Sequence, residues 1–302
     1  MVGISRLING TISPGDVLRY GRSTRHGPAH HLHYSADKKP VVVWNATQRC
    51  NLRCIHCYSD SRDREYPDEL TTPEALRLME DLADYGVPTV LFSGGEPLMR
   101  PDLFEVAARA RELGMRIVLS TNGTLIDPPT AERIRQAGFA YVGISLDGIG
   151  LAHDRIRGKR GAFEATLRGI RLVREQGVRV GLRFTVHALN REELPAIFEL
   201  LREERVPRLC VYHLAYAGRG DRLRRHDLTP AETRAVLDLL FEQARRFHQE
   251  GLELDLLTVD NHADNVYVLL HLLEREPERA PEVFQLLRWN GGNQSGIAIA
   301  AD

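Results

Sequence analysis

Six short apolar runs separated by amphipathic stretches constrain the fold of this chain more than any other feature. The runs are VVVWNA (41–46), TVLFSG (89–94), RIVLST (116–121), YVGISL (141–146), VGLRFTV (180–186) and RLCVYHL (208–214). Between them, apolar residues recur with helical spacing, at roughly 72–86, 101–113, 129–138, 162–177 and 191–204. Strands that alternate with helices form parallel sheets through right-handed crossovers, so the sequence predicts an α/β fold.

Two α/β architectures fit this rhythm: a partial (β/α)6 barrel of the TIM type and a doubly wound sheet. Both place function at the carboxyl ends of the strands. Unusual polar or glycine-rich segments follow four of the runs, namely CNLRCIHC (50–57), SGGEP (93–97), STNG (120–123) and SLDG (145–148). Because such ends meet at one edge of a parallel sheet, we expect these segments to form one site.

The chain divides into three regions by sequence pattern. Residues 1–40 are polar and irregular, and we interpret them as an N-terminal extension that contacts substrate. Residues 41–222 carry the strand and helix alternation and form the predicted core barrel. Residues 223–302 form a mainly helical C-terminal region, with helices expected near 229–250, 264–275 and 279–289. The closing SGIAIA segment reads as the start of a further strand.

Composition narrows the class of protein. The 302 residues are 43% hydrophobic and 27% charged, as in ordinary globular proteins, and the net charge is −1. This charge gives no reason to expect a nucleic acid or an acidic membrane as partner. The start MVGISRLING lacks the pattern of a signal peptide, and no apolar run reaches the length of a membrane span. The sequence therefore predicts a cytoplasmic protein.

Three of the four cysteines lie within eight positions. A disulfide would leave the third cysteine unpaired, and the reducing cytoplasm disfavours it. A structural zinc site needs four ligands, and although His56 or Cys210 offers a fourth, the usual second pair is missing. A four-iron cluster held by three thiolates leaves one iron without a protein ligand, where a reactive ligand can bind. A non-catalytic metal-binding or redox-sensing role stays open at this point.

Cys50, Cys54 and Cys57 are spaced as C-x3-C-x2-C and are followed by Tyr58. Together with SGGEP, STNGT (120–124) and GISLDG (143–148), in this order, the loop resembles that of the radical S-adenosylmethionine (radical SAM) enzymes. The resemblance extends over residues 41–215. It implies a partial (β/α)6 barrel, a [4Fe-4S] cluster on the three cysteines, and S-adenosylmethionine (SAM) bound to the open iron. It also implies an electron donor such as a ferredoxin or flavodoxin, and a 5′-deoxyadenosyl radical that abstracts hydrogen.

The resemblance also implies contacts to SAM. Gly94, Gly95 and Glu96 correspond to the glycine-rich strand end whose backbone meets the amino group of SAM. Glycine allows such a close approach, although Gly-Gly-Glu-Pro is also typical of a tight turn.

Three softer predictions concern residues at later strands. Ser145 is expected to contact the carboxylate or ribose of SAM. Asn122 is either a ligand contact or the residue that holds a turn before Gly123. Arg183 interrupts an apolar run, so its charge needs a partner, which is either the SAM carboxylate or an acidic neighbour.

Segments outside the core resemble the tetrapyrrole-modifying branch of radical SAM enzymes. They are RYGR (19–22), DNHAD (260–264) and NGGNQSG (290–296). This resemblance implies an iron-tetrapyrrole substrate and a role in haem biosynthesis, namely removal of acetate side chains from didecarboxysirohaem to give iron-coproporphyrin III. Two alternatives remain: a haem d1 biosynthesis enzyme that removes propionates from the same substrate, and a peptide-modifying radical SAM enzyme.

Side chains that suit a carboxylated iron macrocycle occur near both ends of the chain. His262 is our candidate catalytic residue, as a proton donor, although Asp260 or Asn261 could equally make this segment a helix start. Arginines bind carboxylates through forked hydrogen bonds, and histidines can ligate haem iron. The N-terminal candidates for these roles are Arg19, Arg22, Arg25, His30, His31 and His33.

One feature departs from the family pattern. The relatives carry further cysteines in a C-terminal extension that hold a second iron–sulfur cluster, whereas here only Cys210 remains. We therefore expect the chain to be a fragment truncated before that segment. Cys210 lies in a predicted strand, where cysteine usually behaves as a small buried apolar residue.

Overall fold

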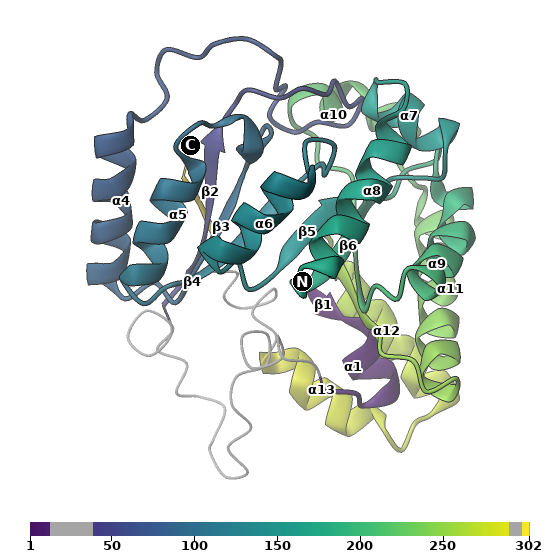
Figure 1. Ribbon diagram of the computed structural model, residues 1–302. Helices are drawn as coiled ribbons and strands as arrows, with labels where there is room; N and C mark the ends of the chain where they lie inside the picture. The colour runs from purple at the N-terminus through teal and green to yellow at the C-terminus, as the bar shows by residue number, and fades with distance from the viewer. Residues whose placement is uncertain (13–38, 290–297, 302) are drawn as a thin grey trace.

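The computed structural model describes residues 1–12, 39–289 and 298–301 (Figure 1). These residues form one sheet in the order β1-β8-β7-β6-β5-β4-β3-β2-β9. Six parallel strands occupy its centre: β2 (Val41–Thr47), β3 (Thr89–Gly94), β4 (Arg116–Thr121), β5 (Val142–Ser145), β6 (Val180–Thr185) and β7 (Arg208–Tyr212). All six coincide with the predicted apolar runs to within two residues at either end.

The strand order decides between the two α/β architectures. From β2 to β7, each strand pairs with the next strand along the chain, so the chain always moves in one direction across the sheet. A doubly wound sheet would reverse direction and place helices on both faces. Because right-handed crossovers in one direction keep the helices on one face, the sheet curls into a partial barrel (Figure 1). The predicted partial barrel is confirmed.

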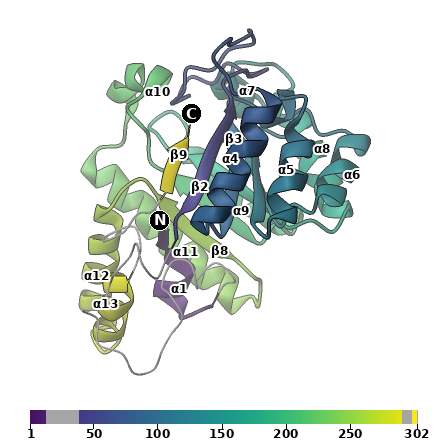
Figure 2. The ribbon, with the colours of Figure 1, turned by 90° about the vertical axis from the view of Figure 1, so that its left-hand side faces the viewer.

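Helices cover the convex face of this sheet (Figures 1 and 2). Their starts and stops follow local rules: a capping box of Thr71 and Glu74 opens the first, and Gly86 ends it in the left-handed conformation. The main covering helices are α4 (Thr72–Tyr85), α5 (Leu103–Glu112), α6 (Pro128–Ala137), α8 (Ala162–Glu175) and α9 (Leu194–Glu203). Short 3₁₀ turns are η1 (Pro97–Met99), η2 (Arg191–Glu193) and η3 (Arg224–His226).

The apolar core lies between the helices and the convex face of the sheet. Trp44 and Phe92 of neighbouring strands meet edge to face with ring centroids 5.6 Å apart, and Phe92 contacts Phe139 in the same way at 5.9 Å. Phe184 and Leu182 are likewise buried with their neighbours in one continuous cluster. Burial of this surface is the main source of stability that the fold offers.

The N-terminal residues differ from the expected irregular extension. Residues Val2–Gly3 form β1, which pairs antiparallel with β8 (Asp255–Val259), and Ile4–Asn9 form α1. Ile4, Leu7 and Ile8 are fully or almost fully buried in the core. A run as short as VGISRLI carries too little periodicity to reveal this role, because its partners lie some 250 residues away.

The C-terminal region is joined to the same sheet. The predicted helices appear as α11 (Pro230–Gln249), α12 (Ala263–Arg275) and α13 (Ala280–Trp289). Between the first two, β8 pairs in parallel with β7, so a boundary at residue 222 would cut one continuous sheet. The expected strand in SGIAIA is β9 (Ala298–Ala301), which lies beside β2 (Figure 2). No helix among the described residues is long and apolar enough to cross a bilayer.

Candidate functional site

The cysteine loop follows β2 at the carboxyl edge of the sheet. Cys50 and Cys54 are buried, and Cys57 is half-buried. The loop backbone is held against the end of α7 (Leu151–Arg157), because the amide of Arg53 donates to the carbonyl of Arg157 at 3.1 Å. The three thiols thus lie on one loop that follows the first strand, the position that the sequence indicated.

A second element clamps the same loop from the other side. The buried Arg219 of α10 (Gly218–Arg222) donates from its Nε to the carbonyl of Cys54 at 2.6 Å, and its backbone amide donates to the carbonyl of Cys57 at 2.8 Å. Its guanidinium also pairs with Asp60 at 2.7 Å. Arg219 was not singled out in the sequence, because nothing nearby distinguishes it from the many surface arginines.

Each thiol has a hydrogen-bond donor close by. The backbone amide of Leu52 lies 3.5 Å from the sulfur of Cys50, Arg157 Nη1 lies 3.5 Å from that of Cys54, and the Ser59 hydroxyl lies 3.4 Å from that of Cys57. Donors of this kind stabilise thiolate ligands and tune iron–sulfur clusters. Burial raises the pKa of the Cys50 thiol to about 12 and raises the pKa of Cys54 as well. Iron binding must therefore displace these protons.

The donor set fits an iron–sulfur cluster better than a single ion. A structural zinc site needs four closed ligands, and the loop itself offers three thiolates. His56, one of the two candidate zinc ligands, instead faces Asp147 at 3.5 Å. A four-iron cluster takes its thiolates on different iron atoms, so three cysteines spread along one loop suit it.

The glycine-rich strand end lies directly beside the cysteine loop. A Cβ at Gly94 would stand 2.3 Å from the Thr47 carbonyl oxygen, and one at Gly95 would stand 2.3 Å from the Arg49 carbonyl oxygen. The amides of Gly95 and Glu96 donate to these same two carbonyls at 2.6 and 2.8 Å. Glycine is therefore needed at both positions because the backbone of residues 47–49 packs directly against them, which places this segment beside the cysteine loop.

Glu96 is fully buried, and its carboxylate joins two strand ends. It accepts hydrogen bonds from the Thr121 hydroxyl at 2.7 Å, the Asn122 amide at 2.7 Å and the Leu98 amide at 3.2 Å. Burial raises its pKa, and these donors oppose the shift. Any SAM contact at this strand end must therefore share the carboxylate with three internal donors or use the backbone.

Asn122 holds the turn before Gly123, which is one of the two roles that the sequence left open; the ligand contact stays a prediction. Its side-chain oxygen accepts from the Thr124 amide at 2.9 Å, which forms a turn, and Gly123 takes a positive φ of 77°. Its side-chain nitrogen donates to Asn51 of the cysteine loop at 2.9 Å and lies 4.0 Å from the sulfur of Cys50. The residue thus ties the end of β4 to the predicted cluster site.

Two further predicted residues, Ser145 and Arg183, lie side by side on neighbouring strands. Ser145 ends β5 and Arg183 lies opposite it in the register of β6. Arg183 donates to Ser120 and Tyr212, and no Asp or Glu of the described residues forms an ion pair with it. The alternative of a structural ion pair for Arg183 is therefore not observed. The N-terminal Arg19, Arg22, Arg25, His30, His31 and His33 lie outside the described residues.

His262 is exposed at the start of α12, as the alternative of a helix start suggested. The neighbouring Asp264 is instead fully buried and pairs through its Oδ2 with Nε2 of His213 at 2.9 Å, just after β7. Asp260 adopts a positive φ of 71°, which is unusual for a residue other than glycine. The DNHAD segment therefore contacts the end of β7 through Asp264 and not through His262.

A buried charged group that the sequence did not reveal lies beneath the cysteine loop. Asp147 pairs with Arg157 Nη2 at 2.5 Å and accepts from the Thr185 amide at 2.8 Å. Burial alone would raise the pKa of Asp147, but Arg157 and His56 hold it below its ordinary value. Burial also lowers the pKa of His56 to about 4, so this imidazole is neutral at pH 7. The group connects SLDG to the cluster loop through Arg157 and Cys54.

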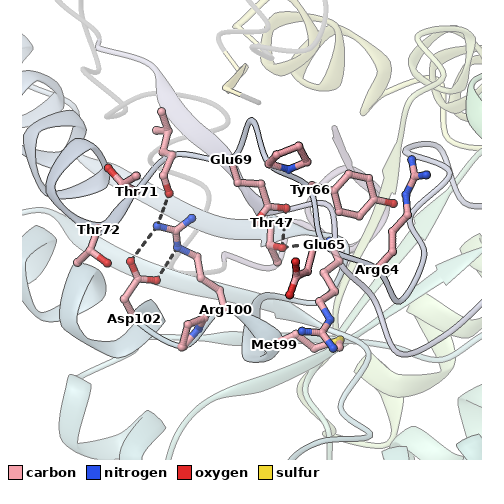
Figure 3. A pocket seen from close by; sticks show the side chains of 14 residues that line it. Thr47, Arg64, Glu65, Tyr66, Glu69, Thr71, Thr72, Met99, Arg100 and Asp102 are labelled. Atoms are coloured by element: carbon pink, nitrogen blue, oxygen red, sulfur yellow. Dashed lines mark hydrogen bonds and ion pairs between the residues drawn. The ribbon is translucent and has the colours of Figure 1, made fainter.

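A separate open cavity of about 380 Å³ lies beside the ends of β2 and β3 (Figure 3). None of the predicted site residues lines it. Its buried Arg100 is already paired with Asp102 and donates to the carbonyls of Ala46 and Leu70. Glu69 likewise accepts from Thr47. With its main charges satisfied internally, this cavity has no evident role in the chemistry of the cysteine loop.

Comparisons with known proteins agree with this arrangement. Residues 44–201 match the radical SAM superfamily. The Fe-coproporphyrin III synthase of Methanosarcina barkeri is 54% identical over 299 residues, which is 99% of this chain and 75% of that protein. The pre-heme d1 synthase of Dinoroseobacter shibae is 44% identical over 267 residues, which is 87% of this chain and 65% of that protein.

A solved structure shares the fold. SuiB of Streptococcus suis, crystallised with S-adenosylmethionine, aligns with a TM-score of 0.61 at 18% identity over 75% of this chain and 52% of that one. The chain thus spans about half of this structure and two thirds to three quarters of the two curated relatives.

Proposed function

Because the chain belongs to the radical SAM superfamily, we propose that it removes acetate side chains from didecarboxysirohaem to give iron-coproporphyrin III. The observation that carries this proposal is the 54% identity to an Fe-coproporphyrin III synthase, which extends over almost the whole chain. The enzyme class, the [4Fe-4S] cluster and SAM follow from the family. The tetrapyrrole substrate and an electron donor such as a ferredoxin or flavodoxin belong to the proposal.

In this proposal Cys50, Cys54 and Cys57 hold the cluster, and the backbone of the Gly94–Glu96 segment, with Asn122 and Ser145, receives SAM. The bound cofactors supply a 5′-deoxyadenosyl radical that abstracts hydrogen from the substrate. The polypeptide provides position: α7 and α10 hold the cysteine loop, and Glu96 joins the ends of β3 and β4. A site that excludes water protects such chemistry from side reactions. A role for His262 as proton donor or substrate contact requires that the macrocycle reach the exposed start of α12.

The test is turnover under strict anaerobic conditions. The cluster is reconstituted, SAM, dithionite and didecarboxysirohaem are added, and both the macrocycle and 5′-deoxyadenosine are followed by mass spectrometry. We expect loss of two acetate groups with formation of iron-coproporphyrin III. Loss of propionates instead would assign the haem d1 reaction, which the similarity to pre-heme d1 synthase makes the second candidate. SAM cleavage with an unchanged macrocycle would contradict the substrate but not the enzyme class.

A further inference from the structure

The concave face of the sheet carries an arginine that is shared by three strands. Arg183 of β6 reaches across β5 at Gly143, where an added Cβ would stand 3.1 Å from the Arg183 Cδ. Its Nη1 donates to the hydroxyl of Ser120 in β4, and its Nη2 donates to the hydroxyl of Tyr212 in β7 at 2.6 Å. Glycine in β5 therefore leaves the space that this guanidinium occupies.

The charge of Arg183 lacks a counter-charge in the part of the chain that the structure describes. By contrast, Arg157 is paired with Asp147 and Arg208 with Asp255. Asp260 is close enough for Arg183 to oppose the rise in its pKa that burial causes, but the two form no ion pair. A guanidinium remains charged in proteins, so holding it inside the barrel without an anion is unfavourable.

The two hydroxyls around Arg183 each have a proton left to donate. Both oxygens accept from the guanidinium, and no described residue accepts a hydrogen bond from either hydroxyl. Burial raises the pKa of Tyr212 to about 12, and Arg183 opposes this shift, so the phenol keeps its proton at neutral pH. Two O–H donors and the unused N–H groups of Arg183 thus lie together, a set that matches the acceptor-only oxygens of a carboxylate.

The position of this group relates it to the cofactor site. Ser120 is the last but one residue of β4, and Asn122, directly after the strand, approaches the sulfur of Cys50. Arg183 stands opposite Ser145, the last residue of β5, in the register of the sheet. Ser120, Arg183 and Tyr212 therefore lie close to the carboxyl ends of their strands. The group runs from β4, the neighbour of β3, to β7, so it borders the proposed SAM site at Asn122 and Ser145 and continues away from the glycine-rich end of β3.

We propose that Arg183, Ser120 and Tyr212 form a carboxylate-binding subsite that holds an acidic side chain of the macrocycle. This inference rests on the proposed function, because the tetrapyrrole supplies the carboxylate. SAM carries a carboxylate of the same chemistry and is the other source that a test must separate. The subsite orients the macrocycle from within the barrel, so that one edge is presented to the cofactors.

Binding equilibria of the cluster-loaded protein test this subsite without turnover. Iron-coproporphyrin III and its methyl ester are titrated by visible absorption in one detergent-containing buffer, and SAM is titrated by calorimetry. We expect Arg183→Gln to weaken binding of the acid form roughly 10- to 100-fold, because it removes charge-assisted hydrogen bonds. Binding of the ester should change less than about threefold, and so should binding of SAM. Tyr212→Phe, which deletes only the hydroxyl, should weaken binding of the acid form by about 3- to 10-fold.

The matched control is Arg109→Gln on α5, an exposed arginine paired with Glu80 outside the barrel, which should leave all three affinities unchanged. Equal weakening of acid and ester, or no change in either, would overturn the subsite. Weakening of SAM binding alone would assign the subsite to the cofactor and overturn its link to substrate. If Arg183→Gln does not fold, Arg183→Lys and Tyr212→Phe decide the same question. Wild-type turnover on the macrocycle, measured separately, reports on the proposed function itself.

Discussion

The two faces of the sheet are built from alternate residues of the same strands, yet they differ completely. On the convex face, Phe92, Leu182 and Phe184 are buried against helices in one apolar cluster. On the concave face, alternate positions carry Ser120, Gly143, Ser145, Gly181, Arg183, Cys210 and Tyr212. Successive side chains of a strand point to opposite faces, so one strand can serve both purposes.

The difference separates stability from ligand binding. The convex face gains free energy by removing apolar surface from water. The concave face carries hydroxyls and a guanidinium near the cysteine loop, which add little to stability but offer donors to a ligand. Removing apolar side chains from the convex face should therefore change folding, and removing polar groups from the concave face and its loop should change binding or activity, whereas adding atoms at a crowded glycine on either face should strain the fold. The following predictions test this division in order of decreasing effect.

The largest effect is expected for Cys54→Ala. Loss of one cluster ligand should lower turnover at least about 1,000-fold, or about 4 kcal/mol of activation free energy. The fold should persist, because the Asp147–Arg157 pair beneath the loop remains. Iron and sulfide content, together with 5′-deoxyadenosine formation, measures the loss. Cys210→Ala, which removes the fourth cysteine, is the control and should retain the cluster; equal loss in both variants would refute the assignment.

Phe184→Ala should show the opposite pattern. The side chain is fully buried on the convex face, so its removal should lower the free energy of unfolding by about 3–5 kcal/mol. Urea denaturation of the cluster-free protein measures this change. Ser145→Ala, a half-buried position on the concave face, should change the free energy of unfolding by less than about 0.5 kcal/mol. A comparable loss in both variants would contradict the claim that the convex face contributes much more to stability than the concave face.

Asp147→Asn tests the buried ion pair between Asp147 and Arg157, which connects the segment after β5 to the cysteine loop. Breaking the pair leaves Arg157 buried without its counter-charge, which should lower the free energy of unfolding by about 3 kcal/mol at pH 7. The folded pKa of Asp147 lies below its ordinary value of 3.8. The pair therefore stabilises the protein above that value and loses its effect as the pH falls through the folded pKa. Denaturation curves of wild type and variant should thus converge in acid; a constant difference would contradict this account.

Gly181→Ala should lower the free energy of unfolding by about 1–3 kcal/mol, less than Phe184→Ala or Asp147→Asn. The added Cβ would stand 2.3 Å from the Tyr141 hydroxyl and 2.9 Å from the Arg208 Cβ. The Tyr141 hydroxyl is buried without a hydrogen-bond partner in the described part of the chain, so Tyr141→Phe alone should be nearly neutral. Combined with Gly181→Ala, it should restore about 1 kcal/mol in a double-mutant cycle. Purely additive effects would show that Tyr141 is not the obstacle.

Much of this molecule could be predicted from local sequence. The six central strands and their helices follow from apolar periodicity, and the cysteine loop, SGGEP and STNG fall at strand ends because parallel strands end at one edge. The N-terminal residues 2–9 could not be placed in this way, because β1 and α1 are stabilised by β8 and α11, far along the chain. The roles of Arg157 and Arg219 were missed for a similar reason: an arginine of a surface-like segment becomes a buried clamp only when the chain folds back.

The sequence by itself determined the class of fold, the position of the cysteine loop after the first strand and the order of the strand-end motifs, because these depend on spacing within short segments. Only the tertiary structure decided which residues share the concave face with them. It brought Arg183 together with Ser120 and Tyr212, and paired Asp264 rather than His262 with the end of β7. These contacts join residues 29 to 63 positions apart, and they depend on strand register and curvature, which no local pattern encodes.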